Sequence, residues 1–126
     1  MIKSQKMEKL TPAEENAMMA VWKSNGGIVK DILEHCPEPK TPYTTLASTL
    51  KNLQKKGFIA AKKYGNVYAY SPLISEDEYA KKALSGLVRN HFENSFKELV
   101  SFFAREEKIS SRELREIIDM IEKHNP

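Results

Sequence analysis

Residues 41–70 read TPYTTLASTLKNLQKKGFIAAKKYGNVYAY, and the first half of this segment has the pattern of a helix. Its leucines recur at helical spacing, which places them on one face. They are Leu46, Leu50 and Leu53. We predict a helix that begins at Thr41 as its N-cap and continues through Lys56, with Gly57 as the residue just past its end.

The second half of the segment has the pattern of a β-hairpin. Residues 58–64 and 67–70 are strand-like runs, and Gly65-Asn66 between them is a typical hairpin turn. Tyr68 and Tyr70 of the second strand are expected to cover the core, and contact with sugar and phosphate groups of a partner is the alternative.

Two further helices are predicted before this segment. Residues 11–14, Thr-Pro-Ala-Glu, are a capping box with proline at the first helical position, so a helix begins there. It ends at residues 24–27, Ser-Asn-Gly-Gly, where the glycines supply the positive φ of a tight turn. A short helix follows over residues 28–33. Helix, turn, helix, helix and hairpin in this order are typical of a winged helix-turn-helix, which we assign to residues 1–73.

Residues 74–126 are predicted to form three more helices. The first begins at a second capping box, from Ser75 to Glu78, and residues 91–95 are the expected break after it. The last helix is expected to open at Ser110. The predicted fold class is therefore mainly α with a small β-hairpin wing, a winged helix-turn-helix followed by a C-terminal helical dimerisation domain.

Charge is unevenly distributed along the chain. Residues 39–75 contain no Asp or Glu, although 29% of the chain is charged. The same segment contains six lysines: Lys40, Lys51, Lys55, Lys56, Lys62 and Lys63. Residues 1–73 hold 11 Lys, no Arg and 6 acids, a formal charge of +5, whereas residues 74–126 hold 9 Lys or Arg and 11 acids, a charge of −2. A positive surface over one helix and one hairpin favours double-stranded DNA as the partner, and a solvated basic face is the alternative.

The polar face of the helix in residues 41–56 has the residue types that contact DNA. Short hydroxyls can approach base edges, so we predict base contacts from Thr44, Thr45 and Ser48. Contacts to the DNA backbone are predicted from the neighbouring hydroxyl, phenol, amide and lysine side chains: Thr41, Tyr43, Lys51, Asn52, Lys55, Lys62 and Lys63. Because residues 1–73 contain no arginine, specificity would come from these contacts, from thymine methyls, from DNA shape and from the pairing of two half-sites by a dimer.

The short helices predicted in the second half of the chain contain many large apolar residues. Such helices are marginal alone and bury their apolar stripes against another element. The residues predicted to form a homodimer interface are Phe92, Phe96, Leu99, Val100, Phe103, Leu114, Ile117, Ile118 and Ile121. Packing of these residues against the winged helix is the alternative. A two-fold partner is favoured, because an exposed apolar patch of this size would promote aggregation.

The residue patterns do not favour an enzyme, a metal site or a cofactor. The three histidines are scattered, and neither C-x-x-C nor H-E-x-x-H spacing occurs. Cys36 is the single cysteine, which excludes an internal disulfide. No apolar run reaches the ~18–20 residues of a membrane span, and the first residues lack the apolar core of a signal peptide. We therefore expect a cytoplasmic protein that is not inserted in a membrane.

Several segments together resemble the penicillinase repressor (BlaI/MecI) family. They are LTPAEE (10–15), MMAVW (18–22), TPYTT (41–45), LQKKGFI (53–59), VYAYSP (67–72), LVSFF (99–103) and KISSREL (108–114). Their order and spacing cover roughly residues 8–123. The resemblance implies a dimeric bacterial repressor whose winged helix binds an operator and whose C-terminal helices interlock.

The resemblance also implies a route of induction. In the best-known members a membrane sensor-protease responds to β-lactam, and the repressor is cleaved at an Asn–Phe bond in its C-terminal domain. This chain has Phe102-Phe103 at that position, so Phe103 matches and Phe102 departs from the pattern. The paired Cys-x-Cys of the copper-responsive relatives does not occur, which disfavours copper sensing.

Two hypotheses of function follow from the sequence. The first is a repressor that binds a two-fold symmetric DNA operator as a homodimer, with β-lactam resistance genes as one class of target. The second is a winged-helix module that binds protein without sequence-specific DNA binding. The two hypotheses require different surface charge. DNA binding favours a helix and wing without acidic residues, whereas a winged helix that binds protein does not require this.

Overall fold

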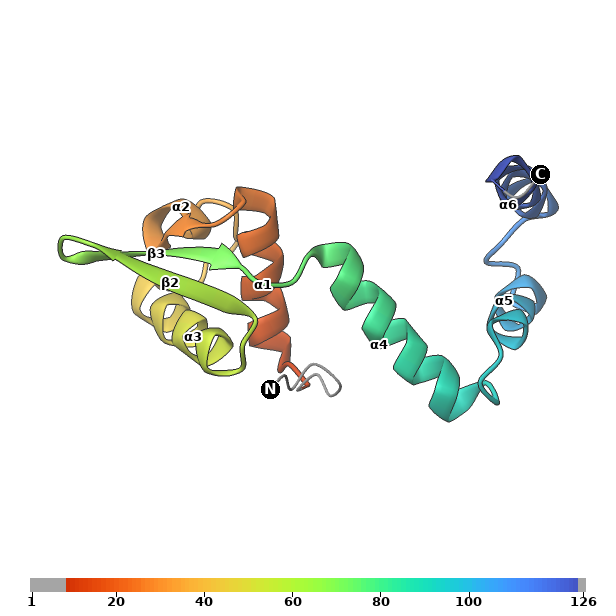
Figure 1. The fold of residues 1–126 in the computed structure, drawn as a ribbon, viewed down its shortest axis with the longest axis horizontal. Helices are drawn as coiled ribbons and strands as arrows, with labels where there is room; N and C mark the ends of the chain where they lie inside the picture. The colour runs from red at the N-terminus through yellow and green to blue at the C-terminus, as the bar shows by residue number, and fades with distance from the viewer. Residues whose placement is uncertain (1–8, 125–126) are drawn as a thin grey trace. The chain divides into compact units, whose positions relative to one another are not determined.

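The structure is a computed structural model that describes residues 9–124. Two compact units divide the chain between Lys82 and Ala83. The first unit contains α1 (Pro12–Ser24), β1 (Gly27–Ile28), α2 (Val29–Leu33), α3 (Tyr43–Lys55), β2 (Ile59–Tyr64), β3 (Val67–Pro72) and the start of α4 (Glu76–His91) (Figure 1). The second unit contains the rest of α4, α5 (Phe96–Arg105) and α6 (Ser111–His124).

The core of the first unit is formed where α1, α2 and α3 pack against one another and against the sheet. Its largest fully buried side chains come from all of these elements: Met18, Val21, Ile32, Leu46, Leu50, Leu53 and Ile59. The three leucines predicted as the inner ridge of α3 are therefore in the core. Burying side chains of this size stabilises the fold by about 1.5–3 kcal/mol each.

The ends of α1 follow the sequence signals. The Thr11 hydroxyl accepts a hydrogen bond from the Glu14 backbone N–H, and the Glu14 carboxylate accepts one from the Thr11 N–H, so the predicted capping box is confirmed. After α1, Asn25 and Gly26 have φ of 62° and 87°. A Cβ at Gly26 would collide with the Tyr70 carbonyl oxygen, so this turn requires glycine both for its φ and for the close approach of β3.

The sheet has three antiparallel strands in the order β1-β3-β2. The predicted hairpin is confirmed, with Tyr64 paired to Val67 across the turn. The φ of +61° falls at Gly65, the first turn residue, as a type II′ turn requires. Strand β1 was not predicted, because a strand of two residues has no detectable periodicity and is formed by pairing with β3.

The predicted start of α3 is wrong by one residue. The Pro42 carbonyl accepts the first helical hydrogen bond, from the Leu46 N–H, so Pro42 is the N-cap and Thr41 lies outside the helix. The other end agrees with the prediction. Lys56 is the C-cap, and Gly57 follows it with φ of +86°.

Helix α4 begins on the first unit. Ser75 and Glu78 form the predicted capping box at its N-terminus. Tyr79 in its first turn packs against Trp22 and Phe58, with ring centroids 5.6 and 6.0 Å apart. Residues 76–82 are therefore part of the compact winged-helix unit by packing. The functional division at residues 73/74, with DNA binding before it and dimerisation after it, stays a prediction.

The second unit has a small interior. Val88 and Leu99 are buried, and Phe102 makes edge-on ring contacts with Phe92 and Phe103 at 5.6 and 5.5 Å. The Ser110 hydroxyl accepts a hydrogen bond from the Glu113 backbone N–H and caps the N-terminus of α6, as predicted. Helix α6 has no buried residue. Within the second unit Leu114 is half-buried, whereas Ile117, Ile118, Met120 and Ile121 of this helix are exposed.

Candidate nucleic-acid interface

The six lysines of residues 39–75 fall into two groups. Two of them are bonded within the protein. Lys40 Nζ donates to the carbonyl oxygens of Leu33, Glu34 and Cys36, which satisfies the C-terminal end of α2. Lys56 pairs with Glu14.

The remaining four are exposed and have no hydrogen bond or ion pair among residues 9–124: Lys51, Lys55, Lys62 and Lys63. These are the four lysines that the sequence predicts as phosphate contacts.

The outward face of α3 carries the residues predicted to contact bases. Thr44, Thr45 and Ser48 are all exposed. The Ser48 hydroxyl donates to the Thr45 carbonyl oxygen at 3.1 Å, so its lone pairs face outward as acceptors. The Thr44 hydroxyl has no bond within the described residues and is free to act as donor or acceptor. The face can therefore read base edges of either polarity.

The other predicted contacts from this region surround that face. Tyr43 is the first residue of α3 and is 54% exposed. Asn52 is exposed, two turns after Thr45 on the edge of the helix away from the hairpin. Thr41 is half-buried in the loop before the helix. Tyr43 and Asn52 are therefore accessible to DNA on different edges of α3, and Thr41 is the least accessible of the three.

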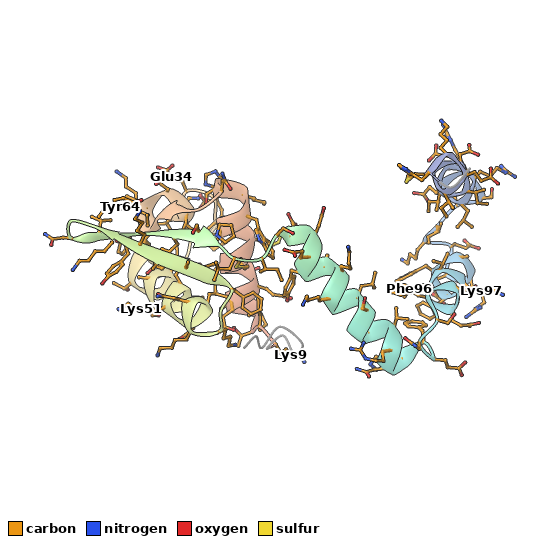
Figure 2. All side chains as sticks on the ribbon, viewed as in Figure 1. Lys9, Glu34, Lys51, Tyr64, Phe96 and Lys97 are labelled. Atoms are coloured by element: carbon orange, nitrogen blue, oxygen red, sulfur yellow. The ribbon has the colours of Figure 1, made fainter. Side chains whose placement is uncertain are left out.

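The two wing lysines lie on opposite faces of the hairpin, because successive side chains in a strand alternate. Lys63 is paired with Tyr68, and its Nζ lies 5.9 Å from that ring. Lys62 lies over Tyr64 on the other face, at 5.4 Å. Figure 2 shows Tyr64 close to the tip of the wing and Lys51 on α3. The expectation that Tyr68 covers the core is wrong, since it is 48% exposed, whereas Tyr70 is buried as expected.

A shallow hollow of about 400 Å³ lies between α3 and the hairpin. It is lined by Lys51, Gln54, Lys55, Tyr68 and Tyr70. The α3 residues come together because positions i, i+3 and i+4 share a helix face. Gln54 was not among the predicted contacts, although its position three residues after Lys51 places both side chains on the same face of α3. Lysines from the helix and aromatic rings from the wing therefore line one surface.

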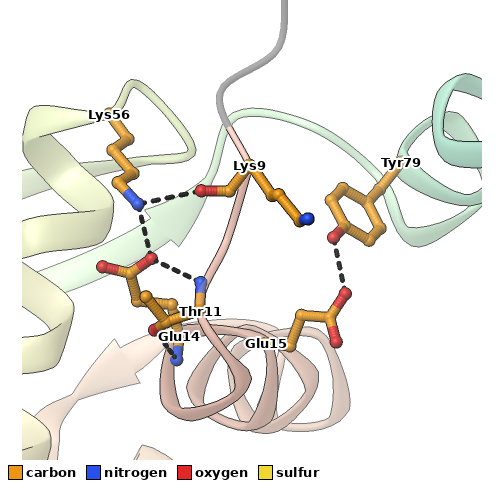
Figure 3. Close-up of polar contacts among 6 residues, drawn as sticks. All are labelled: Lys9, Thr11, Glu14, Glu15, Lys56 and Tyr79. Carbon is orange, nitrogen blue, oxygen red and sulfur yellow. Dashed lines mark hydrogen bonds and ion pairs between the residues drawn. The ribbon is translucent and has the colours of Figure 1, made fainter. Parts of the chain in front are cut away.

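A partly buried ion pair holds the end of α3 that carries Lys55. Lys56 Nζ lies 2.6 Å from Glu14 Oε1 and also donates to the Lys9 carbonyl oxygen at 3.0 Å (Figure 3). Glu14 is only 6% exposed. The hydrogen bonds from Lys56 and from the Thr11 backbone hold the pKa of the Glu14 carboxyl below its usual value. The pair joins the first turn of α1 to the C-cap of α3.

Glu15, in the same turn of α1, makes a second polar contact, to Tyr79 of α4. The Tyr79 hydroxyl donates to Glu15 Oε2 at 2.8 Å (Figure 3). Burial and this carboxylate raise the pKa of Tyr79 to about 12. Together with its ring contacts, this bond fastens the start of α4 to the winged-helix unit.

The residues predicted to form the dimer interface divide by exposure. Three contribute to the interior of the second unit, since Leu99 is buried and Phe92 and Leu114 are half-buried. The other six are 39–54% exposed: Phe96, Val100, Phe103, Ile117, Ile118 and Ile121. Phe102 and Phe103, at the predicted cleavage position, both lie within helix α5.

The described residues contain neither a candidate metal site nor a helix that could span a membrane. Between residues 9 and 124, no group of three or more His, Cys, Asp or Glu side chains could hold a metal ion. No helix in this part of the chain has the length and apolar character needed to cross a membrane.

The order of helices and strands, with an exposed basic surface on α3 and the hairpin, defines the winged helix-turn-helix class. The comparison with known proteins then gives the family. The chain belongs to the penicillinase repressor family, whose family model matches residues 10–123. This family consists of transcriptional repressors, so the interpretation as a repressor and not an enzyme is confirmed.

Relatives match over nearly the whole chain. The penicillinase repressor of Bacillus licheniformis is 23% identical over 120 residues, which are 94% of each chain. The methicillin resistance regulatory protein MecI of Staphylococcus aureus (strain N315) is 26% identical over 119 residues, 94% of this chain and 97% of that one. Among solved structures, the DNA-binding domain of the repressor BlaI matches with a TM-score of 0.50 and 27% identity, over 59% of this chain and 92% of that one. The predicted mainly α fold with a winged helix-turn-helix is confirmed, and the role of the C-terminal helices in dimerisation stays a prediction.

Proposed function

We propose that this protein is a homodimeric transcriptional repressor of the cytoplasm that occupies a two-fold symmetric DNA operator. In each protomer α3 enters the major groove, and the hairpin wing follows the flanking backbone. Thr44, Thr45 and Ser48 contact base edges, while the exposed lysines contact phosphates.

The observation that carries this proposal is the sorting of the lysines. The ammonium groups of Lys40 and Lys56 are bonded within the protein, to the Cys36 carbonyl oxygen and to Glu14, so these two lysines stabilise the fold. The other four are exposed on α3 and the wing, in a segment without one acidic residue. Such an arrangement attracts phosphates and gains affinity by releasing counterions. A winged helix that binds protein has no need of it.

The apolar side chains of the second unit support the homodimer. Helix α6 presents Ile117, Ile118 and Ile121, each at least 43% exposed, and none of its residues is buried. An amphipathic helix of this kind is stable when a partner covers its apolar face. A second copy of the chain supplies that cover and also pairs two half-sites.

The names of the relatives support β-lactam resistance genes as the class of target, since those proteins are penicillinase and methicillin resistance regulators. Derepression would follow cleavage by a membrane sensor-protease at Phe102-Phe103. The bond lies inside α5, and both side chains are about 40% exposed, so the helix would have to unwind before a protease could bind it.

The test is a footprint on the DNA upstream of the protein's own gene, combined with the mass of the complex in solution. Protection of two symmetric half-sites by two protomers is expected. Protection of a single half-site by one protomer would contradict the homodimer. A folded protein that ignores DNA altogether would favour the protein-binding module instead.

A further inference from the structure

The hollow between α3 and the wing contains a buried tyrosine whose hydroxyl has no partner. Tyr70 is 6% exposed and lines the hollow together with Lys51, Gln54 and Lys55. No hydrogen bond to its hydroxyl is made within residues 9–124. A hydroxyl with no partner in the protein is available to donate a hydrogen bond to a ligand.

The Tyr70 hydroxyl reaches solvent. In the described part of the chain, no side-chain nitrogen or oxygen is both sealed from solvent and unbonded. Since the Tyr70 hydroxyl is unbonded, it must reach solvent, although the rest of its side chain is packed in the core. The hollow is the surface that Tyr70 lines, and the packed ring fixes where the hydroxyl stands. Burial also raises the pKa of Tyr70, which keeps the group protonated as a donor.

Each polar side chain that lines the hollow carries a hydrogen-bond donor that an anion can use. Lys51 and Lys55 carry ammonium groups that have no carboxylate partner in the described residues, and Gln54 has an amide N–H₂. Lys63 lies over the ring of Tyr68 at the wall of the hollow. No acidic residue lines it. Such a set of donors fits an oxyanion, and it disfavours a cation or a neutral apolar ligand.

We propose that the hollow is a phosphate-binding site that holds one backbone phosphate of the DNA in each half-site. The Tyr70 hydroxyl and the Gln54 amide donate hydrogen bonds to the phosphate oxygens, Lys55 neutralises the charge of this phosphate, and Lys51 neutralises that of the adjacent one. This inference rests on the proposed function. It adds Tyr70 and Gln54 as DNA-positioning residues. In this proposal α3 and the wing together bind one phosphate in the hollow between them.

The experiment measures duplex binding by the full-length Tyr70→Phe variant, which loses only the hydroxyl. Since that hydroxyl has no partner within the described residues, the urea midpoint of unfolding should not fall. Affinity for the operator and for an unrelated duplex should fall by the same factor, about tenfold or more, because a phosphate contact carries no sequence information. Unchanged affinity would overturn the inference. Failure of the wild-type protein to bind any duplex would refute the proposed function instead.

A second measurement identifies the phosphate and its source. Operators with one neutral methylphosphonate per half-site are titrated with the wild-type protein and with Tyr70→Phe. At one position the substitution should weaken the wild-type protein more than the variant, because the variant lacks the Tyr70 contact to that phosphate and keeps the others. Additive losses at every position would overturn the inference. Binding of inorganic phosphate that requires Tyr70 and displaces no DNA would assign the hollow to a free oxyanion, which also contradicts a DNA phosphate.

Discussion

Replacing Lys55 with alanine should flatten the salt dependence of operator binding by about 1.8 units of log–log slope. Lys55 is exposed on α3, lines the hollow beside the wing and has no ion pair among residues 9–124. Its ammonium group is therefore free to displace counterions from one phosphate. Each phosphate neutralised contributes about 0.9 to the slope, and a homodimer carries two copies of the side chain.

The size of the effect is large enough to measure. Between about 50 and 200 mM salt, a slope difference of about 1.8 changes the ratio of the two dissociation constants roughly twelvefold. The variant should bind much more weakly than the wild-type protein at low salt, and the difference should narrow as salt increases. Fluorescence anisotropy of a labelled operator duplex, titrated at several salt concentrations, gives both slopes.

Lys123→Ala is the matched control. It removes the same charge from an exposed lysine of α6 in the second unit. Its slope should equal that of the wild-type protein. If Lys55→Ala weakened binding without changing the slope, or if both variants changed it equally, Lys55 would not be a phosphate contact. The reasoning from unpaired lysines would then fail.

Three further outcomes are expected. Thr44→Ala should lower discrimination between operator and random duplex by ~1–3 kcal/mol and spare non-specific binding, whereas equal losses on all duplexes would remove its role in base contact. Because the Glu14 carboxyl has a lowered pKa when folded, its contribution to the free energy of unfolding is present above about pH 4.5 and is lost as pH falls through the folded pKa. Urea denaturation between about pH 6 and pH 3 should show this loss in the wild-type protein and less of it in Glu14→Gln, and identical pH dependence would contradict it. Ile118→Asp should yield a folded monomer by analytical ultracentrifugation, with Lys123→Asp on the polar face of α6 still dimeric, and a dimeric Ile118→Asp would place the interface elsewhere.

Helix ends and the hairpin were predictable because their signals are local. A capping box such as Thr11 with Glu14 joins a side chain to backbone three residues away, so its geometry follows from sequence spacing. The start of α3 shows the limit of this approach. Thr41-Pro42 is compatible with a cap at either residue, and the hydrogen bond from Leu46 selects Pro42.

The candidate site was predictable in part for the same reason. The outward face of α3 follows from helical spacing, but the roles of individual lysines depend on partners far along the chain. Lys56 looks like its neighbour Lys55 in the sequence, yet it pairs with Glu14, 42 residues away. The sequence likewise could not show that Leu99 is buried within its own unit, or that the hydroxyl of buried Tyr70 stays unpaired.

The most direct test of the repressor is the binding of the full-length protein to the DNA upstream of its own gene, measured across a salt series. Four unpaired lysines per protomer, on a homodimer, predict sequence-selective binding with a log–log slope of about −7. Binding that is absent at low salt, or that is insensitive to salt, would contradict the assignment of the α3 and wing surface to DNA.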